Sequence, residues 1–555
     1  MKKLAFALAF SAAALAAGAQ SSVDYYNLSQ SQLRGTARYM SMAGAFGALG
    51  GDISTLTQNP AGIGVYRSSD ITATLDIDLR RTTLDNTGSQ PYRNAQTNVA
   101  CNNFGYVGAA KTGSSIMPYF QWGAAYNRVQ TFNRYYRGYF PEIATSWTNQ
   151  VAAASEGYTS RELEGRVNSD NQIVYDPFYD SDADWLSALA YNSFLINGGR
   201  DGNYVGLFQN GSTGNAEVEV EERGYIDEYT INFGGNFADM IYWGLGIGIR
   251  DLSFTRYANY NEQISNALVP VDPDNTDRLG NGAAEWGIDT YQSVSGSGVN
   301  LKFGLIFKPI NEFRLGFAVH TPTWYNLQFN QSAQTTYGLG RIEADNYYTF
   351  DNMAGGPDEG NPFADTGNGY WSRSCKSPWR LMASAATVIG GRFILSADYV
   401  YEAYPSMGDS GLDSSVEVSD DIKRYYAGSN ELRVGAELRV TPGLSIRAGY
   451  GMKTSGVKAD AREGRDYVYT SGVSSMYTFD GTRSNITAGI GYRWSQFYVD
   501  LAYVHSTSTA KWNAFTPFPR QANEAYSLAA GAKSGPTADL TDTSNRLALT
   551  LGFRF

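Results

Sequence analysis

Residues 299–320 read VNLKFGLIFKPINEFRLGFAVH. Every second residue is apolar over 299–307, and the alternation resumes over 313–319. A period of two is typical of a β-strand whose two faces meet different surroundings. The four residues between the runs, 309–312, include Pro and Asn, which favour turns. The stretch therefore predicts an antiparallel hairpin with one apolar face and one polar face.

The same alternation returns along the chain up to the C-terminal Phe555. Short connections alternate with long ones, and the longest of these, 129–224, follows the third expected strand. Short turns on one rim and long loops on the other are typical of a transmembrane barrel. We therefore predict an all-β fold, a 14-stranded antiparallel transmembrane β-barrel over residues 70–555. Its strands are expected at 70–80, 104–112, 117–128, 225–237, 241–256, 294–308, 313–329, 378–389, 392–404, 431–441, 444–455, 483–494, 497–508 and 545–555.

The two faces of these strands differ in charge. The apolar rows hold no Asp, Glu, Lys or Arg, and a charge at the bilayer midplane costs about 2–4 kcal/mol. A dry core could not hold the ions of the opposite rows without a large desolvation cost, whereas a wet lumen can. The apolar rows are thus predicted to face lipid. The charged rows include Lys302, Arg314, Arg392, Asp398, Glu402, Arg433, Glu437, Arg439, Arg447 and Asp500.

Composition excludes several classes of protein. Acidic residues outnumber basic ones by 54 to 43, so the net charge is −11 and no basic excess exists to bind nucleic acid. Two Cys and two His argue against a disulfide scaffold, a Cys-based zinc site and a His-rich metal site. We expect no metal and no cofactor.

The first 19 residues have the pattern of a signal peptide. Lys2 and Lys3 precede an apolar run over 4–15, and Ala17-Gly18-Ala19 offers a cleavage site. The run is too short to span a bilayer as a helix. A buried N-terminal helix is the alternative interpretation.

Residues 20–69 show no alternation. Their centre, 38–62, reads RYMSMAGAFGALGGDISTLTQNPAG. Asp52 can cap a short helix over 53–58, and Pro60 would end it. The segment is too apolar for a disordered tail, and the nearest volume it can fill is the barrel lumen. We predict that it plugs the lumen, and a small cap outside the barrel is the alternative.

This segment resembles the N-terminal hatch of the FadL/TodX-type transporters. The resemblance rests on a run of small residues followed by the hatch motif Gly51, Asp52, Asn59, Pro60, Ala61 and Gly62. The hairpin over 299–329, with LGFAVHTP at 315–322, is similar to a later strand pair of that family. The resemblance implies a channel in the outer membrane of a Gram-negative bacterium for passive uptake of hydrophobic compounds such as long-chain fatty acids.

The resemblance also implies a route for the ligand. The outer loops would capture it, and an apolar pocket near the hatch would bind it. The ligand would then leave past the hatch through an opening in the wall, where Pro118 and Gly123 could deform the third strand. The residues expected beside that pocket are Tyr39, Met40, Met42 and Phe46.

The longest loop holds the best helix candidate, 182–196. Its residues Trp185, Leu189 and Phe194 lie largely on one helical face. The helix could fold over the barrel mouth as a lid, or it could form one wall of a capture site. In the family, the capture groove follows the fifth and seventh strands, so the two interpretations stay open.

Chemistry-bearing residues are few. His505 lies near Ser506 and Asp500 but has no second element, so no enzyme is expected. Asp272, Asp274 and Asp277 share one loop and could bind calcium or form a solvated acidic surface. The partners expected are outer-membrane lipid and a hydrophobic small molecule, with the chain as a monomer. The alternatives are a structural or surface-interaction barrel, a haem-type receptor and an outer-membrane hydrolase.

Overall fold

The computed structural model describes ten stretches of the chain. They are residues 21–85, 94–198, 203–271, 278–342, 348–349, 354–410, 416–463, 467–470, 472–520 and 531–555. The expected signal peptide and the expected calcium loop at 272–277 lie outside these stretches.

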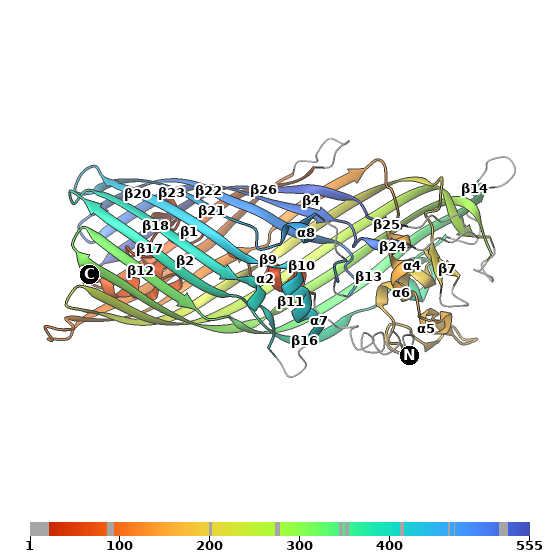
Figure 1. Ribbon diagram of the computed structural model, residues 1–555, viewed down its shortest axis with the longest axis horizontal. Helices are drawn as coiled ribbons and strands as arrows, with labels where there is room; N and C mark the ends of the chain where they lie inside the picture. The colour runs from red at the N-terminus through yellow and green to blue at the C-terminus, as the bar shows by residue number, and fades with distance from the viewer. Residues whose placement is uncertain are drawn as a thin grey trace.

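The chain forms one closed antiparallel β-barrel (Figure 1). Each strand pairs with the next along the chain, and the first, β1, pairs with the last, β26, from Asp70↔Arg554 to Asp85↔Asp539. The predicted 14-stranded barrel is confirmed. Its strands are β1 (Asp70–Asp85), β2 (Asn94–Lys111), β3 (Tyr119–Thr131) continued by β4 (Arg134–Phe140), β9 (Thr213–Phe237), β10 (Ile241–Pro270), β11 (Leu279–Ile310), β12 (Phe313–His320) continued by β13 (Trp324–Ile342), β16 (Gly369–Lys376) continued by β17 (Trp379–Ile389), β18 (Phe393–Ala403), β20 (Gly428–Arg439), β21 (Leu444–Lys453), β22 (Tyr477–Trp494), β23 (Phe497–Asn513) and β26 (Thr537–Arg554).

The remaining elements lie in the N-terminal segment and the long loops. The N-terminal segment holds α2 (Ser22–Leu28), α3 (Ala37–Ser41), η2 (Ile53–Thr57) and η3 (Pro60–Val65). The loops hold α4 (Trp147–Ala154), α5 (Ser160–Leu163), β5 (Arg166–Val167), β6 (Ile173–Tyr175), α6 (Trp185–Asn192), β7 (Ile196–Gly198), β8 (Tyr204–Gly206), β14 (Tyr348–Thr349), β15 (Ala354–Gly355), η4 (Pro357–Glu359), η5 (Pro362–Ala364), η6 (Tyr404–Ser406), β19 (Gly408–Asp409), α7 (Val416–Tyr425), α8 (Ala459–Arg462), β24 (Phe518–Arg520) and β25 (Gly531–Lys533). None of the described helices is long and apolar enough to cross a membrane.

The faces are oriented as the charge pattern predicted. On β11, Leu301 is 48% exposed whereas its neighbour Asn300 is 2% exposed. Ionic side chains of the inner face pair with one another, as Arg447 does with Glu437 (2.7 Å) and Asp500 (2.5 Å). Exposed apolar side chains of neighbouring strands thus form a belt that suits acyl chains. On β10 and β11, its members are Ile241, Leu245, Ile247, Ile249, Val299, Leu301, Phe303, Leu305 and Phe307.

Several strands continue far beyond this belt, where the sense of the alternation reverses. On β10, inward-facing Tyr260 and Ile264 are at most 2% exposed, whereas outward-facing Asn259 and Gln263 are polar. The wall here has water outside and packed loops inside, so the apolar side chains turn inward. The strands expected at 241–256 and 294–308 leave a long loop over 257–293, and this prediction is wrong because most of these residues extend β10 and β11.

Two strands are interrupted next to prolines. β12 and β13 are separated by residues 321–323, which include Pro322, and β16 and β17 by 377–378, which include Pro378. Proline has no N–H to donate to a sheet. The single strand expected over 313–329 is therefore divided.

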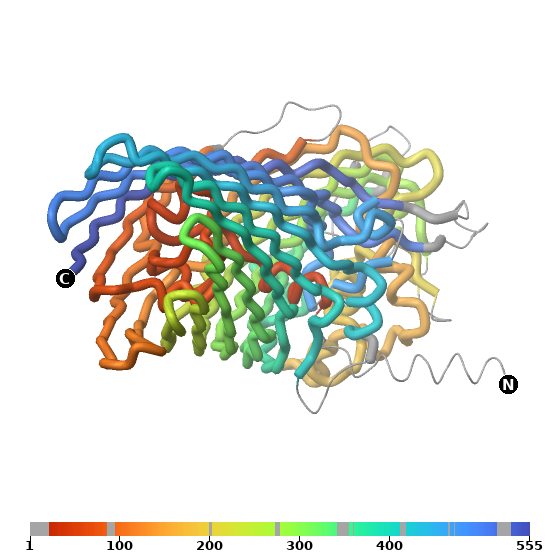
Figure 2. The backbone as a smooth tube through the Cα atoms, turned by 60° about the vertical axis from the view of Figure 1, so that its left-hand side comes forward, coloured from red at the N-terminus to blue at the C-terminus, as the bar shows by residue number. Residues whose placement is uncertain are grey.

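Residues 21–66 pack against the inner faces of the strands. The Ala37 N–H donates to Thr550 Oγ1 (2.7 Å), and the Gly47 N–H donates to Asp398 Oδ2 (2.9 Å). In Figure 2 this segment, in red, lies among the strands. β1 begins at Asp70, where the first strand was expected. The assignment of this segment as a hatch domain stays a prediction.

Candidate functional site

The hatch motif residues pack closely against two strands. Asp52 accepts from the Ser54 N–H (2.9 Å) at the start of η2, as its capping role predicted, and Asn59 accepts from the Ala61 N–H (3.1 Å) at the start of η3. Pro60 lies at the first turn of η3, where its missing N–H is not needed.

Glycines of the barrel wall leave room for this motif. A Cβ on Gly244 of β10 would lie 2.2 Å from the Pro60 carbonyl carbon, and one on Gly304 of β11 would lie 2.0 Å from Asn59 Oδ1. Gly51 and Gly62 are joined by a backbone hydrogen bond of 3.1 Å. The motif thus fixes the backbone of the segment against the wall.

The four residues expected beside an apolar pocket are fully buried. Tyr39, Met40, Met42 and Phe46 are at most 1% exposed and form one cluster with small side chains of the wall. They do not line the cavities described below. Their role in ligand binding stays a prediction.

The wall has a gap between β2 and β3. The two strands pair from Lys111↔Tyr119 only as far as Asn103↔Asn127. Beyond that point β2 pairs with β1 alone, while β3 and β4 pair with β9. Asn102 is the extra residue of a bulge in β2, opposite Thr74 and Leu75.

The gap is level with the lipid-facing belt. Cys101 and Val99, on the part of β2 that does not pair with β3, lie opposite Leu75 and Ile77 of β1. The side chains of Leu75 and Ile77 are 58% and 45% exposed. We expected Pro118 and Gly123 to deform the third strand. Instead β3 starts just after Pro118, Gly123 pairs regularly with Val107, and the irregularities lie at Asn102 and next to Val129.

Residues 32–35 of the N-terminal segment lie behind this gap and are bonded to both of its edges. The Gln32 N–H donates to the Val129 carbonyl of β3 (3.0 Å). The Asn102 side chain of β2 donates to the Gly35 carbonyl (2.9 Å). Where the two strands do not pair with each other, they are therefore joined through the N-terminal segment, besides a direct side-chain hydrogen bond from Asn133 to Asn98 (3.1 Å).

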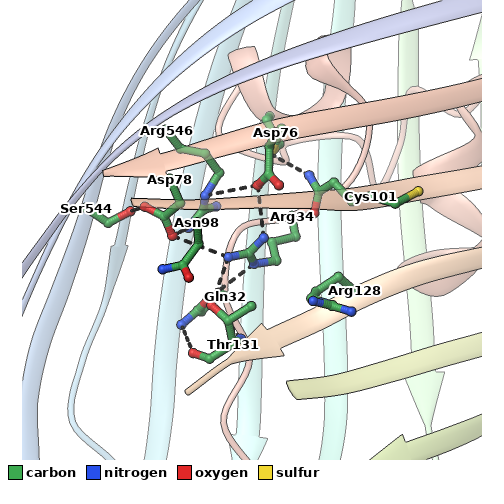
Figure 3. Close-up of polar contacts among 12 residues, drawn as sticks. Gln32, Arg34, Asp76, Asp78, Asn98, Cys101, Arg128, Thr131, Ser544 and Arg546 are labelled. Carbon is green, nitrogen blue, oxygen red and sulfur yellow. Dashed lines mark hydrogen bonds and ion pairs between the residues drawn. The ribbon is translucent and has the colours of Figure 1, made fainter. Parts of the chain in front are cut away.

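Arg34 is the centre of the polar network at this place (Figure 3). Its Nη1 pairs with Asp76 (3.0 Å) of β1, and its Nη2 donates to Thr131 Oγ1 (3.0 Å) of β3. Arg546 of β26 also contacts Asp76 (3.4 Å) and Asp78 (3.6 Å). The sequence placed Asp76 and Asp78 on the polar face of the first strand, but nothing in it indicated that Arg34 would be their partner.

A cavity of about 120 Å³ adjoins the gap on its long-loop side. Its lining combines apolar side chains from α2, β3–β4, β10 and β11 with several ionic groups. Residues 130–132, at the edge of the gap, form part of this lining. The apolar members include Val23, Leu28, Phe132, Phe254, Val294 and Met476.

Several ions of this cavity are paired, but Arg256 and Arg483 have no ion pair with any described residue. Arg134 pairs with Glu222 (2.6 Å), and Arg80 contacts Asp542 (3.4 Å). Arg256 donates only to neutral groups, Ser474 Oγ and the Met476 carbonyl (both 3.3 Å), and its buried Nε has no acceptor among the described residues. A guanidinium group that has no carboxylate partner and lies next to apolar side chains suits a hydrophobic ligand with one acidic end.

The long loop after β3 packs inside the extended wall. Leu189 of α6 is fully buried, Trp185 donates its Nε1–H to the Phe178 carbonyl (2.7 Å), and Phe194 contacts the Tyr337 ring at 5.9 Å between centroids. Leu189 thus belongs to a buried cluster, and Trp185 and Phe194 pack against it. Roles as a lid or in ligand capture stay predictions.

Glu262 joins this cluster to the wall beyond the lipid-facing belt. Its carboxylate accepts from the Trp147 N–H (3.0 Å) at the start of α4 and from the Tyr260 hydroxyl (2.7 Å). Burial raises the pKa of Glu262 to about 7, although these hydrogen bonds oppose the rise.

The histidines serve structural contacts. His320 Nε2 donates to the Gln58 carbonyl (2.6 Å), in keeping with the polar network expected in the lumen. His505 contacts Asn545 Oδ1 (2.9 Å) and Thr507 (3.4 Å), so its described partners include neither a serine nor a carboxylate. Across the described stretches, no group of three or more His, Cys, Asp or Glu side chains could hold a metal ion.

The fold and the gap define a transmembrane β-barrel whose lumen holds its own N-terminal segment. No protein-family model matches the sequence, and no curated protein matches it. Solved structures similar to it include a Pseudomonas aeruginosa FadL homologue (13% identity, 95% of this chain and 99% of that one, TM-score 0.47). The Pseudomonas putida toluene transporter TodX (12%, 94% and 99%, TM-score 0.43) and the Ralstonia pickettii toluene transporter TbuX (13%, 94% and 99%, TM-score 0.37) are others. These transporters are of the type that the N-terminal motif resembles.

Proposed function

We propose that the chain is an outer-membrane channel for passive uptake of hydrophobic molecules that carry one acidic group, with long-chain fatty acids as the simplest members. The observation that carries the proposal is the cavity beside the gap, with its apolar wall and the unpaired Arg256. The carboxylate would bind the guanidinium while the chain contacts the apolar side chains.

The place of the gap supports lateral release. It lies between β2 and β3 at the level of the lipid-facing residues of β1, so a ligand leaving there would enter the acyl layer without crossing bulk water. Residues 32–35 close the gap from inside, so release requires this part of the hatch to move. The hatch thus serves as the gate.

The test compares an acid with a neutral analogue of equal length. We expect Arg256→Gln to weaken oleate binding by about tenfold, because one charge-assisted hydrogen bond contributes about 1.5–3 kcal/mol. Oleyl alcohol should bind equally to both proteins. Binding is measured by isothermal titration of the purified protein in detergent.

Arg223→Gln is the matched control, because Arg223 is an exposed arginine beyond the lipid-facing belt and pairs with Glu221. It should leave oleate binding unchanged. Equal oleate affinity in the wild type and Arg256→Gln would contradict the assigned role of Arg256.

A structural or surface-interaction barrel is the second candidate. Ion pairs within the membrane-spanning part of the lumen favour it, among them Lys302 with Glu228 and Arg447 with Asp500. In that case neither oleate nor oleyl alcohol would bind. Neither histidine lines the cavity beside the gap, so its lining gives no support to a haem-type receptor.

A further inference from the structure

A second, larger cavity opens at the opposite end of the barrel. Its volume is about 510 Å³, and its lining includes Pro442 and Gly443 of a short turn and residues 49–53 of the hatch. Short turns lie on the periplasmic side of bacterial transmembrane barrels. We call this cavity the short-turn vestibule.

The vestibule is strongly basic although the whole chain is acidic. Seven arginines line it, against three carboxylates. The net charge of the chain is −11, so this excess is local and opposes the average. A concave surface of one sign raises the local concentration of the opposite ion.

Four of these arginines have carboxylate partners. Arg38 of the hatch and Arg447 of β21 share Glu437, at 2.9 and 2.7 Å. Arg554 pairs with Asp70 at 2.6 Å, and Arg67 pairs with Asp239. The three carboxylates of the lining are those of Asp52, Glu437 and Asp500. Asp52 accepts hydrogen bonds from the Thr36 hydroxyl (2.8 Å) and the Ser54 N–H (2.9 Å).

Arg314, Arg439 and Arg493 have no ion pair with any described residue. Arg439 and Arg493 are exposed to the vestibule, on strands separated only by β21 and offset by two residues, which places their backbones about 12 Å apart. Arg314 donates its Nη1–H to the Leu49 carbonyl (2.8 Å), but its buried Nε has no acceptor. A buried donor without an acceptor is costly unless a ligand or water binds it.

We infer that the short-turn vestibule binds a multiply charged oxyanion, with phosphate as the common unit, which enters from the periplasmic side and is held by Arg439 and Arg493. The planar guanidinium group matches the oxygens of phosphate with two parallel hydrogen bonds. The spacing of the two strands suits an anion with more than one charged centre. Arg38 and Asp52 belong to the same lining, so the bound anion would lie against the hatch.

The test uses the full chain purified in detergent, with inorganic pyrophosphate as the probe. We expect the double variant Arg439→Gln/Arg493→Gln to bind pyrophosphate at least about tenfold more weakly than the wild type in isothermal titration. The variant Arg439→Lys/Arg493→Lys keeps both charges and should retain more of the affinity. Migration of unheated samples on a gel shows whether each barrel is folded.

The matched control is Lys308→Gln/Arg392→Gln, which removes two cations from the same rim outside the vestibule lining. It should bind pyrophosphate within about twofold of the wild type. Equal losses of pyrophosphate affinity in the two double Gln variants would overturn the assignment, because the affinity would then depend on the overall positive charge of the rim.

A soluble short-chain phosphatidic acid distinguishes the two sources of phosphate. Tighter binding of the lipid than of pyrophosphate, lost in Arg439→Gln/Arg493→Gln, would assign the vestibule to a lipid headgroup. Equal or tighter binding of pyrophosphate would assign it to a free anion. Failure of both probes to bind the wild type would overturn the inference, whatever the outcome for oleate at the other end.

Discussion

Replacing Arg34 with Gln should loosen the N-terminal segment at the gap. Arg34 has a side chain 2% exposed and contacts Asp76, Asp78 and Thr131 at 3.0, 3.5 and 3.0 Å. Removing one partner of a buried ion pair costs about 3–5 kcal/mol. Both aspartates keep Arg546, so we expect the lower end, about 3 kcal/mol, or roughly a hundredfold in the opening equilibrium.

Hydrogen exchange followed by mass spectrometry measures this opening directly. The Gln32 amide is bonded to Val129, so peptides covering 28–36 should exchange about a hundredfold faster in Arg34→Gln. Arg38→Gln is the control, because Arg38 is a hatch arginine whose partner Glu437 keeps Arg447. Unchanged exchange of 28–36 in Arg34→Gln, or an equal increase in Arg38→Gln, would refute the reasoning.

Three further predictions concern the membrane belt, the hatch and the lid. Phe303→Arg should destabilise the folded barrel by about 2–4 kcal/mol, measured by urea unfolding from lipid vesicles. Ser295→Arg, which faces outward on the same strand beyond the belt, should cost little stability. Equal losses of stability in the two variants would contradict the assignment of the belt. Deleting residues 24–62 should convert a nearly closed pore into a leaky one in planar bilayers, and unchanged conductance would remove the hatch assignment. The raised pKa of Glu262 favours its protonated form in the folded state, so the attachment of α4 to the wall should lose stability as pH rises from about 4.5 through about 7. The protection factor of α4, which is the intrinsic exchange rate at each pH divided by the measured rate, should fall over that range in the wild type but not in Glu262→Gln, and identical profiles of the protection factor would contradict the attachment.

The barrel could be predicted because its signal is repeated. Alternation at 299–320 and its recurrence gave the strand number, and the absence of charge from one face gave the orientation of Leu301 and Asn300. The part of the strands beyond the lipid-facing belt was not predicted. There the alternation is reversed, so that Tyr260 faces inward and Asn259 faces outward. A strand pattern defined by apolar residues on the outer face does not fit these residues, so they were assigned to a loop.

The site was less predictable, because its groups meet only through the closed fold. Asp52 and Asn59 could be assigned as caps, since capping is local. Arg34, by contrast, is 42 residues from Asp76 and 97 from Thr131, and no spacing rule connects them. The unpaired state of Arg256 depends on which carboxylates the other strands bring near it.

The length of the strands beyond the lipid-facing belt affects where a solute would enter the barrel. β10 continues for 21 residues past Ile249, its last belt residue, which at the usual rise and tilt is about 50 Å of climb. In an outer leaflet coated with saccharide, this extension would hold the long-loop end of the barrel clear of the sugars. Under the proposed function, a hydrophobic solute would then enter above this coat and leave at the level of the acyl chains.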